Sequence, residues 1–481
     1  MSGKEQFAVC VRWCNDSFEV FEDFIGFVET EKTDSSSLFE LLKDVLLRCQ
    51  LNINKCRGHA YDGAANMSGI MNSVRTRFQS LVPSALFVHC LNHNLQLAVQ
   101  DASSCTRIIQ DILNLCSDII NFIKLSPKRL SAFKKLQHDM LKTSKSLRPL
   151  CPTRWTVRAD ALSSILEKIR STPGPSDVTS KVGGILFNLL RFSTLFSLTV
   201  GTETFSVTDF IATKLQAKDT DARTAQDLFE ICITHLAALR SDEKFSELWQ
   251  KLQSKSASLG IEVSAPRERR ISVRKDERPA NQHQFSMEEY FRKEYFAVLD
   301  AMRISVENRS SSSKSAFTIL RVIESLLLGS INSSITGDEM TQKLQVLENM
   351  FSSDLDFGKF QCELKLLPRL LVIANVQSMT KLDSVCEAFV KNPSSSSIYG
   401  ETVRLLKIYF TVPMTSCSAE RSFSSLRRLK TYLRQTMTQK SLNTVALCHV
   451  HRSRCNDELV KSVFSEFVMK NSNRQNYFGK F

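Results

Sequence analysis

Hydrophobic and polar residues alternate at the start of the chain, over "FAVCVRW" and "SFEVFEDF", with "CNDS" between them (residues 7–24). Alternation on both sides of a short polar segment is typical of a β-hairpin. The pattern continues through "DFIGFVE" (residues 23–29), which predicts a third strand. We therefore expect the chain to open as an antiparallel meander.

Helical and strand patterns then take turns along the sequence. The spacing predicts helices over residues 35–50, 66–82 and 92–102, and short strands over residues 55–60 and 85–90. Serines at the start of the first helix can cap it. The expected order is β-β-β-α-β-α-β-α, which starts as a meander and continues through strand–helix crossovers. A mixed α/β sheet is therefore expected over residues 1–102.

Residues 103–392 have a different pattern, because apolar residues recur there at i, i+3 and i+4 and predict an all-α segment. Residues 264–284, "SAPRERRISVRKDERPANQHQ", lack this period and are basic. We expect an exposed loop there, and a phosphate-contacting arm is the less favoured interpretation. The stretch "NPSSSSIYG" (residues 392–400) is typical of a linker. A third domain over residues 393–481 follows.

The last segment contains two amphipathic helical patterns after Pro413. Thr415, Ser416 and Ser418 can cap the first of them. The apolar positions of the two patterns are either core residues or a dimer interface, and the sequence does not separate these alternatives. They are Phe423, Leu426, Leu429, Leu433, Leu442, Val445 and Leu447.

Composition narrows the class of protein. The 481 residues are 42% hydrophobic and carry 63 Lys and Arg against 50 Asp and Glu, a net charge of +13. This excess favours a polyanionic partner such as nucleic acid. The 14 cysteines include no C-x-x-C pair, which argues for reduced thiols in a nuclear or cytosolic protein. No apolar run reaches the roughly 18–20 residues of a membrane span, so no membrane partner is expected.

Two carboxylates are candidates for metal-dependent chemistry. Asp62 ends a predicted strand in "GHAYDGAANMSG", and Glu420 begins a helix in "SCSAERSF". Phosphodiester transfer uses about three carboxylates that hold two divalent cations roughly 3.5–4 Å apart. Local features alone favour a turn role for Asp62 by roughly three to one. The helix dipole alone accounts for a glutamate in the position of Glu420.

Two further motifs have structural and functional interpretations. Cys90 and His93 form a C-x-x-H pair, which is half of a zinc site at most, so a hydrogen-bonded structural role is favoured. Arg154 and Trp155 precede a helix in "CPTRWTVRADAL". A tryptophan there is usually a core residue, and stacking on an extruded base is the rarer use.

In this order, "GHAYDGAANMSG", "HCLNHNLQLAVQDA", "CPTRWTVRADAL" and the segment from "TVPMTSCSAERSF" to "VALCHV" resemble hAT-superfamily DNA transposases. The closest resemblance is to transposon-derived vertebrate proteins of the zinc finger MYM-type 1-like kind. The resemblance implies an α/β RNase H-like fold interrupted by a large all-α insertion domain. It also implies that Asp62 is the second catalytic aspartate and Glu420 the catalytic glutamate.

The same resemblance assigns Cys90 and His93 to the family's C-x-x-H motif, and Trp155 to the residue that assists a flipped base. It makes the region around Glu420 a dimerisation segment, so the expected partner is a second copy, as a homodimer or higher oligomer.

The chain departs from the family in one respect that matters for catalysis. No strand with a catalytic aspartate precedes "KEQFAVCVRW", and no N-terminal zinc finger is found, so the chain is expected to be N-terminally truncated. Whether it is a complete gene product or a fragment stays open. With two of three carboxylates, the expected protein is an inactive, dimerising, nuclear transposase remnant that needs no cofactor. The alternatives are an active Mg²⁺- or Mn²⁺-dependent transposase and a non-specific DNA-binding adaptor.

Overall fold

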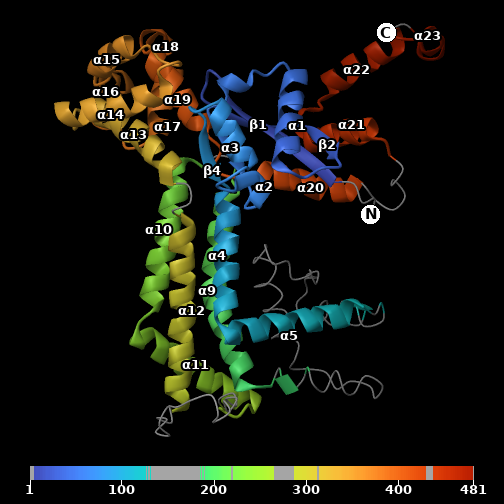
Figure 1. The fold of residues 1–481 in the computed structure, drawn as a ribbon, viewed down its shortest axis with the longest axis vertical. Helices are drawn as coiled ribbons and strands as arrows, with labels where there is room; N and C mark the ends of the chain where they lie inside the picture. Colours follow the sequence, from blue (N-terminus) through green and yellow to red (C-terminus); the bar gives the residue numbers. More distant parts are fainter. Residues whose placement is uncertain are drawn as a thin grey trace. The chain divides into compact units, whose positions relative to one another are not determined.

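The computed structural model describes residues 5–125, 190–217, 220–264, 286–310, 314–429 and 437–479, with a few isolated residues between 126 and 189. The chain forms two compact units, one of residues 1–90 with 315–481 and one of residues 91–314 (Figure 1). The predicted domain boundaries lie elsewhere, at 102/103 and 392/393. The helices between residues 315 and 392 belong to the first unit.

The first unit begins with a hairpin of β1 (Glu5–Cys14) and β2 (Val20–Thr30) in antiparallel register. The side chain of Asn15 shapes the turn, because its Oδ1 accepts hydrogen bonds from the backbone N–H groups of Ser17 and Glu19 at 3.0 and 2.8 Å. The predicted third strand is wrong, since its residues continue β2. A bulge beside Val9 and Cys10 absorbs the extra residue and lets one long strand persist.

A second, parallel pair consists of β3 (Gly58–Tyr61) and β4 (Leu86–His89). Before β3 come α1 (Ser35–Arg48) and the 3-10 turn η1 (Ile53–Lys55), and between the two strands come α2 (Ala65–Ser68) and α3 (Val74–Leu81). The predicted alternation of helices and strands is confirmed here, but the single helix predicted over residues 66–82 is wrong, because α2 and α3 are separate helices. Residues of β1, α1, α3 and the loop before β4 share one hydrophobic core. It consists of Val9, Leu38, Phe39, Leu42, Val45, Val74, Phe78, Val82 and Ala85.

The single mixed sheet expected from the sequence is wrong, because the described strands form two separate pairs. The last turn of α19 (Gly400–Thr411) contacts the first pair, and the irregular segment around Pro413 contacts the second. Arg12 Nε of β1 donates to Phe410 O at 3.0 Å, and a Cβ on Gly58 of β3 would meet Val412 Cα at 2.8 Å. Pro413 has no N–H to add to a ladder, so this segment lies against the strands without joining them.

Helices after this segment pack on the hairpin. They are α20 (Cys417–Leu429) and α21 (Gln439–Val450), which follow α19 (Gly400–Thr411) and lie beside β2. The side chain of Asn443 holds α21 to β2 by accepting from Phe27 N at 2.8 Å and donating to Phe27 O at 2.7 Å. A second core forms beneath them, from Phe24, Phe27, Leu429, Leu442 and Ala446. The chain then continues through η6 (Arg452–Arg454), α22 (Asp457–Met469) and α23 (Ser472–Phe478).

Six helices complete the first unit: α13 (Lys314–Ile331), α14 (Gly337–Phe351), α15 (Phe357–Leu366), α16 (Arg369–Ala374), α17 (Leu382–Lys391) and α18 (Pro393–Ile398). The buried carboxylate of Glu363 joins them to α19, because it accepts from the backbone N–H groups of Glu401 and Thr402. The linker predicted at residues 392–400 is wrong. Pro393 there begins α18, at the position where a helix needs no N–H.

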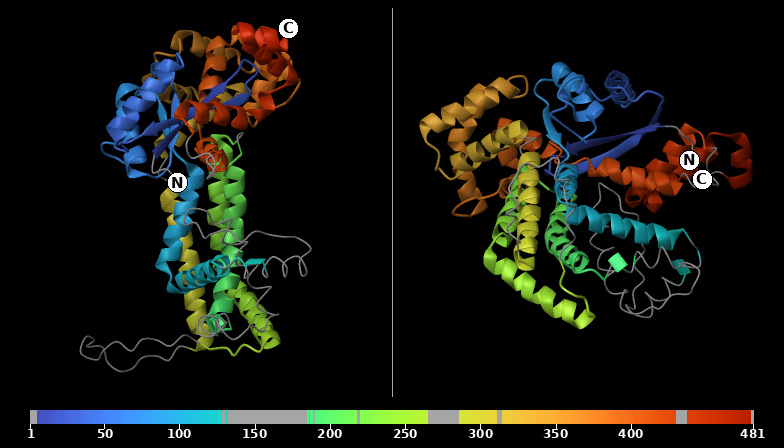
Figure 2. Two further views of the ribbon diagram at one scale, coloured as in Figure 1. Left: turned by 90° about the vertical axis from the view of Figure 1, so that its right-hand side faces the viewer. Right: turned by 60° about the horizontal axis from the view of Figure 1, so that its bottom comes forward.

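The described elements of the second unit are all helices: α4 (Leu91–Cys105), α5 (Arg107–Lys124), α9 (Phe192–Leu215), α10 (Ala222–Leu239), α11 (Asp242–Leu259) and α12 (Met287–Ser310). Four of them, α4, α9, α10 and α12, run side by side (Figure 1 and Figure 2). An ion pair between Arg309 and Asp101 at 2.7 Å ties α12 to α4. No helix in the described part of the chain is long and apolar enough to cross a membrane.

Candidate functional site

Asp62 lies where the chain leaves β3, at the carboxyl end of the parallel pair. Its side chain is exposed and makes a local contact, with Oδ1 accepting from Ala64 N at 3.3 Å. Its backbone carbonyl accepts from the Ser68 hydroxyl. These bonds are those of a turn residue. Its role as the second catalytic aspartate, which the family resemblance implies, stays a prediction.

Cys90 lies next to Asp62 in the fold, because it follows β4 and its backbone N donates to Tyr61 O at 2.9 Å. Its side chain is fully buried. Two residues from the first turn of α20, Cys417 and Glu420, face it. The two Sγ atoms and a carboxylate oxygen of Glu420 lie within 4.8 Å of one another. The structure therefore brings together Cys90 and Glu420, which are 330 positions apart in the sequence, and adds Cys417.

Hydrogen bonds shift the pKa values of the Cys90 and Cys417 thiols in opposite directions. A hydrogen bond from Cys417 and the backbone N–H of Ser416, 3.3 Å from Cys90 Sγ, lower the pKa of Cys90 below its usual value despite burial. The pKa of Cys417 is raised, first by its hydrogen bond to Cys90 and then by burial. Cys90 is thus the more acidic partner and Cys417 the proton donor.

The family resemblance implies Mg²⁺ or Mn²⁺ at Glu420, and the residues gathered there do not fit those ions. Among the described residues, the group of possible metal ligands at this place contains two thiols and one carboxylate, and Asp62 is not a member of it. Mg²⁺ takes oxygen ligands in near-ideal octahedral geometry, whereas thiolates select softer ions. We therefore derive no catalytic step through Mg²⁺.

Two residues beside this group are not among the candidates named from the sequence. Cys417 is one of them, and its position three residues before Glu420 on one helical pattern was the available signal. Glu22 is the other: it pairs with Arg12 at 2.8 Å across the hairpin and accepts from the Ser418 hydroxyl. The hairpin register places Arg12 opposite Glu22, so an alternation pattern with the right turn predicts this ion pair.

The remaining residues predicted to contact nucleic acid are His93, Arg154 and Trp155. His93 is half-buried in the first turn of α4 and belongs to the second unit, while Cys90 belongs to the first. Arg154 and Trp155 lie outside the described residues, as does the predicted basic loop apart from Ser264. Their roles stay predictions.

Most of the residues predicted for dimerisation pack in or against the hydrophobic core of the first unit. Leu429 and Leu442 are buried in the core around Phe27, and Leu426, Val445 and Leu447 pack against that core. Phe423 is 41% exposed, with its ring 5.6 Å from that of Phe27. Leu433 lies outside the described residues. The core interpretation therefore accounts for five of these positions.

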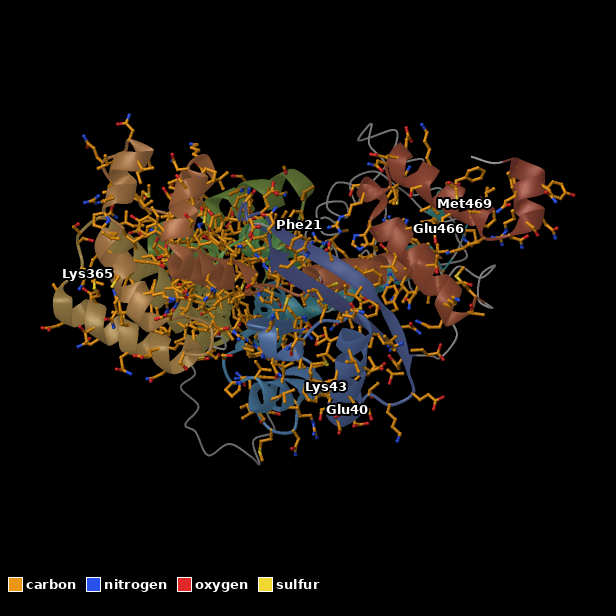
Figure 3. The ribbon with its side chains drawn as sticks, turned by 90° about the horizontal axis from the view of Figure 1, so that it is seen from above. Phe21, Glu40, Lys43, Lys365, Glu466 and Met469 are labelled. Atoms are coloured by element: carbon orange, nitrogen blue, oxygen red, sulfur yellow. The ribbon has the colours of Figure 1, made fainter. Side chains whose placement is uncertain are left out.

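A different apolar surface is exposed on α22, which packs mainly on α23. Leu459, Val460, Val463 and Phe467 are each between 45% and 57% exposed, and Val468 is the buried residue of this helix. Figure 3 shows Glu466 and Met469 of α22 well separated from Phe21 on the hairpin. We refer to Leu459, Val460, Val463 and Phe467 as the α22 face.

Comparisons with known proteins match two segments of the chain. Residues 1–73 match the family model described as the ZMYM1/FAM200, RNase-like domain. Residues 381–453 match the hAT family C-terminal dimerisation region, which contains Cys417 and Glu420 and ends just before α22. The chain therefore contains one segment similar to this RNase-like domain and one similar to the hAT dimerisation region.

Two curated proteins are similar along most of the chain, and both are named 52 kDa repressor of the inhibitor of the protein kinase. The protein from Homo sapiens is 21% identical over 472 residues, and the one from Mus musculus is 22% identical over 474 residues. Each alignment covers 94% of this chain and 60% of the relative. The chain thus spans about 60% of the length of these relatives.

Proposed function

We propose that this chain is a domesticated hAT-derived protein that self-associates through its C-terminal region and does not catalyse DNA transposition. The observation that carries the proposal is the α22 face, whose first residue, Leu459, lies six residues after the end of the matched dimerisation segment. A contiguous apolar face on a soluble unit is typical of an interaction site. The nucleus is the proposed location, in keeping with relatives that are named repressors.

The α22 face fits a second copy of this chain as its occupant. Leu459, Val463 and Phe467 recur every four residues and form one stripe, flanked by Val460. This stripe continues the chain directly from the matched dimerisation segment, which favours a copy of the same chain over another partner. In a two-fold dimer the stripe of one copy packs against the same stripe of the other copy, so each apolar residue of the stripe is buried in both copies.

Sedimentation equilibrium over a range of protein concentrations tests this proposal. Val463→Asp places a charge in the centre of the stripe and should weaken dimerisation by more than about tenfold, since two charges are buried per dimer. Ser462→Asp adds the same charge at an exposed position of α22 outside the stripe and should leave the association constant unchanged. A wild-type protein that stays monomeric at tens of micromolar, or equal effects of both changes, would contradict the proposal.

The proposed lack of catalysis is supported by the two thiols beside Glu420 and by the absence of Asp62 from that group of described ligands. The wild-type chain with Mg²⁺ or Mn²⁺ should neither cleave nor join DNA with transposon-type ends. Asp62→Asn and Glu420→Gln should be equally inert. Metal-dependent cleavage that either substitution abolishes would show that the chain is an active transposase.

DNA binding is a second candidate function, favoured by arginines on α20. Arg421, Arg427 and Arg428 are exposed along this helix, and the net charge of the chain is +13. Contacts with phosphates through such residues release counterions, so the affinity for duplex DNA should fall steeply with salt. Binding that is weak and insensitive to salt would exclude this function.

A further inference from the structure

We propose that Cys90, Cys417 and Glu420 form a binding site for Zn²⁺ or a similar thiophilic divalent cation. This inference goes beyond self-association and does not depend on it. Two thiolates and one carboxylate provide three of the four ligands of a tetrahedral zinc site, and a water molecule can supply the fourth. The same set disfavours Mg²⁺ and Mn²⁺, which prefer oxygen ligands.

The distances in this group are close to those that zinc requires. Zn–S bonds are about 2.3 Å and Zn–O bonds about 2.0–2.2 Å long, so neighbouring ligand atoms on a tetrahedral ion lie roughly 3.5–3.8 Å apart. The three ligand atoms here already lie within 4.8 Å of one another. Small rotations of the side chains are therefore sufficient, without a movement of the backbone.

Regular elements hold all three ligands in place. Cys90 follows β4 directly, and its backbone N–H is fixed by the 2.9 Å bond to Tyr61 O. Cys417 and Glu420 are three positions apart in the first turn of α20, so they lie on one face of that helix. The positive end of the helix dipole at this turn stabilises anionic ligands. A site built from a strand end and a helix start needs little reorganisation on binding.

The surroundings of the group also suit a cation. The Ser416 backbone N–H donates to Cys90 Sγ at 3.3 Å, a type of contact that stabilises metal-bound thiolates. Ser416 Oγ is buried without a hydrogen-bond partner, so it is free to bond to a water on the ion. Among the described residues, none forms an ion pair with the carboxylate of Glu420. A divalent cation would neutralise the negative charge that the two sulfurs and this carboxylate bring together.

Coordination has a defined proton balance. Both sulfurs bind as thiolates, so the thiol protons of Cys90 and Cys417 leave to solvent when the ion enters. No electron is transferred and no covalent bond between the sulfurs is formed.

Titration of the reduced full-length chain with Co²⁺ tests the site, since cobalt reports on thiolate ligands by charge-transfer absorption. One equivalent should produce sulfur-to-cobalt absorption together with the d–d bands of a tetrahedral ion, and Zn²⁺ should abolish both signals. A millimolar excess of Mg²⁺ should not. Zn²⁺ affinity is then measured by competition with a coloured chelator.

Variants assign the signal to these residues. Loss of a hydrogen-bond partner of a metal ligand lowers metal affinity roughly 10- to 100-fold. Cys90→Ser and Cys417→Ser each remove a ligand itself, so each should weaken Zn²⁺ binding by more than that. Cys386→Ser, a change at another buried thiol of the same unit, should leave both signals intact. The exposed cysteines Cys49, Cys105, Cys362, Cys448 and Cys455 are also left in place, and they should not sustain binding in the two serine variants.

Glu420→Gln keeps the test decisive if a serine variant fails to fold, because it preserves the size of a half-buried side chain. It should retain the sulfur-to-cobalt absorption and still lower the affinity for Zn²⁺. The proposal is overturned if the wild-type chain shows no thiolate absorption with Co²⁺. It is equally overturned if Glu420→Gln and the folded serine variants bind Zn²⁺ as the wild type does.

Discussion

Two consecutive helices, α21 and α22, have similar lengths of 12 and 13 residues and both have an apolar face. The apolar face of α21 is buried: Leu442 and Ala446 are fully covered in the core with Phe27. The α22 face is exposed, although it carries more large side chains. An apolar stripe therefore indicates that a helix needs a packing partner. It does not indicate whether that partner lies in the same chain.

Polar contacts account for the fate of α21. Asn443 pairs with both backbone groups of Phe27, and Gln439 adds a third bond to Phe27 O at 2.8 Å. These bonds fix α21 to β2 and bury its apolar residues. By contrast, α22 has α23 as its main packing partner and keeps its stripe in solvent.

The largest expected effect on stability is at a core residue of α21. Leu442→Ala should lower the free energy of unfolding by about 2–5 kcal/mol, because it leaves a cavity beside Phe27. Leu459→Ala on the α22 face removes the same atoms from a half-exposed position and should change the stability of the monomer by less than about 0.5 kcal/mol. Urea denaturation at low protein concentration measures both. Equal losses would remove the distinction between the helices.

A smaller effect is expected at the polar contact. Asn443→Ala leaves Phe27 N without its acceptor and should cost about 1–3 kcal/mol of stability. Thr444→Ala, next to it on the exposed side of α21, should cost much less. Thermal and urea denaturation of the two variants give the comparison. If Asn443→Ala is as mild as Thr444→Ala, the side-chain bonds do not fix this helix to the hairpin.

The smallest effect concerns the end of α21, where Arg454 of η6 pairs with Asp23 of β2. Burial raises the pKa of Asp23, but hydrogen bonds from Arg454 and Trp13 outweigh it and lower the pKa below its usual value. A lowered pKa in the folded state stabilises the protein above the unfolded-state pKa of about 3.9, and this part is lost as pH falls through the folded value. Solvent screening limits it to less than about 1 kcal/mol.

Asp23→Asn should therefore reduce stability slightly at pH 7 and leave it almost unchanged once the pH has fallen below the folded-state pKa of Asp23. Urea titrations of both proteins at several pH values below 5 provide the measurement. A loss for Asp23→Asn that is the same at all pH values would show that the ion pair is not its source.

Much of the fold could be predicted from local patterns. Alternation gave the hairpin, and helical periods gave the helices around β3 and β4. The errors arose where the outcome depends on contacts distant in sequence. The bulge that merges two predicted strands into β2 depends on pairing with β1, and α18 forms from a serine-rich stretch that packs beside α17 and α19.

The candidate site shows the same division. Asp62, Cys90 and Glu420 could be selected from motifs and their order along the chain. Their neighbours could not, because Cys417 meets Cys90 only when α20 is placed against the end of β4. Likewise, the sequence favoured Leu429 and Leu442 as interface residues as readily as core residues, and only the position of β2 decides between them.

By itself, the sequence determined the order of the elements, their apolar faces, the excess of positive charge and the hAT resemblance, since these properties follow from spacing within a few residues or from motifs. The tertiary structure decided which faces are covered, which thiols meet Glu420 and which helix remains available to a partner. Burial and ligand geometry depend on residues that lie hundreds of positions apart, as Cys90 and Cys417 do. A local pattern does not carry that information.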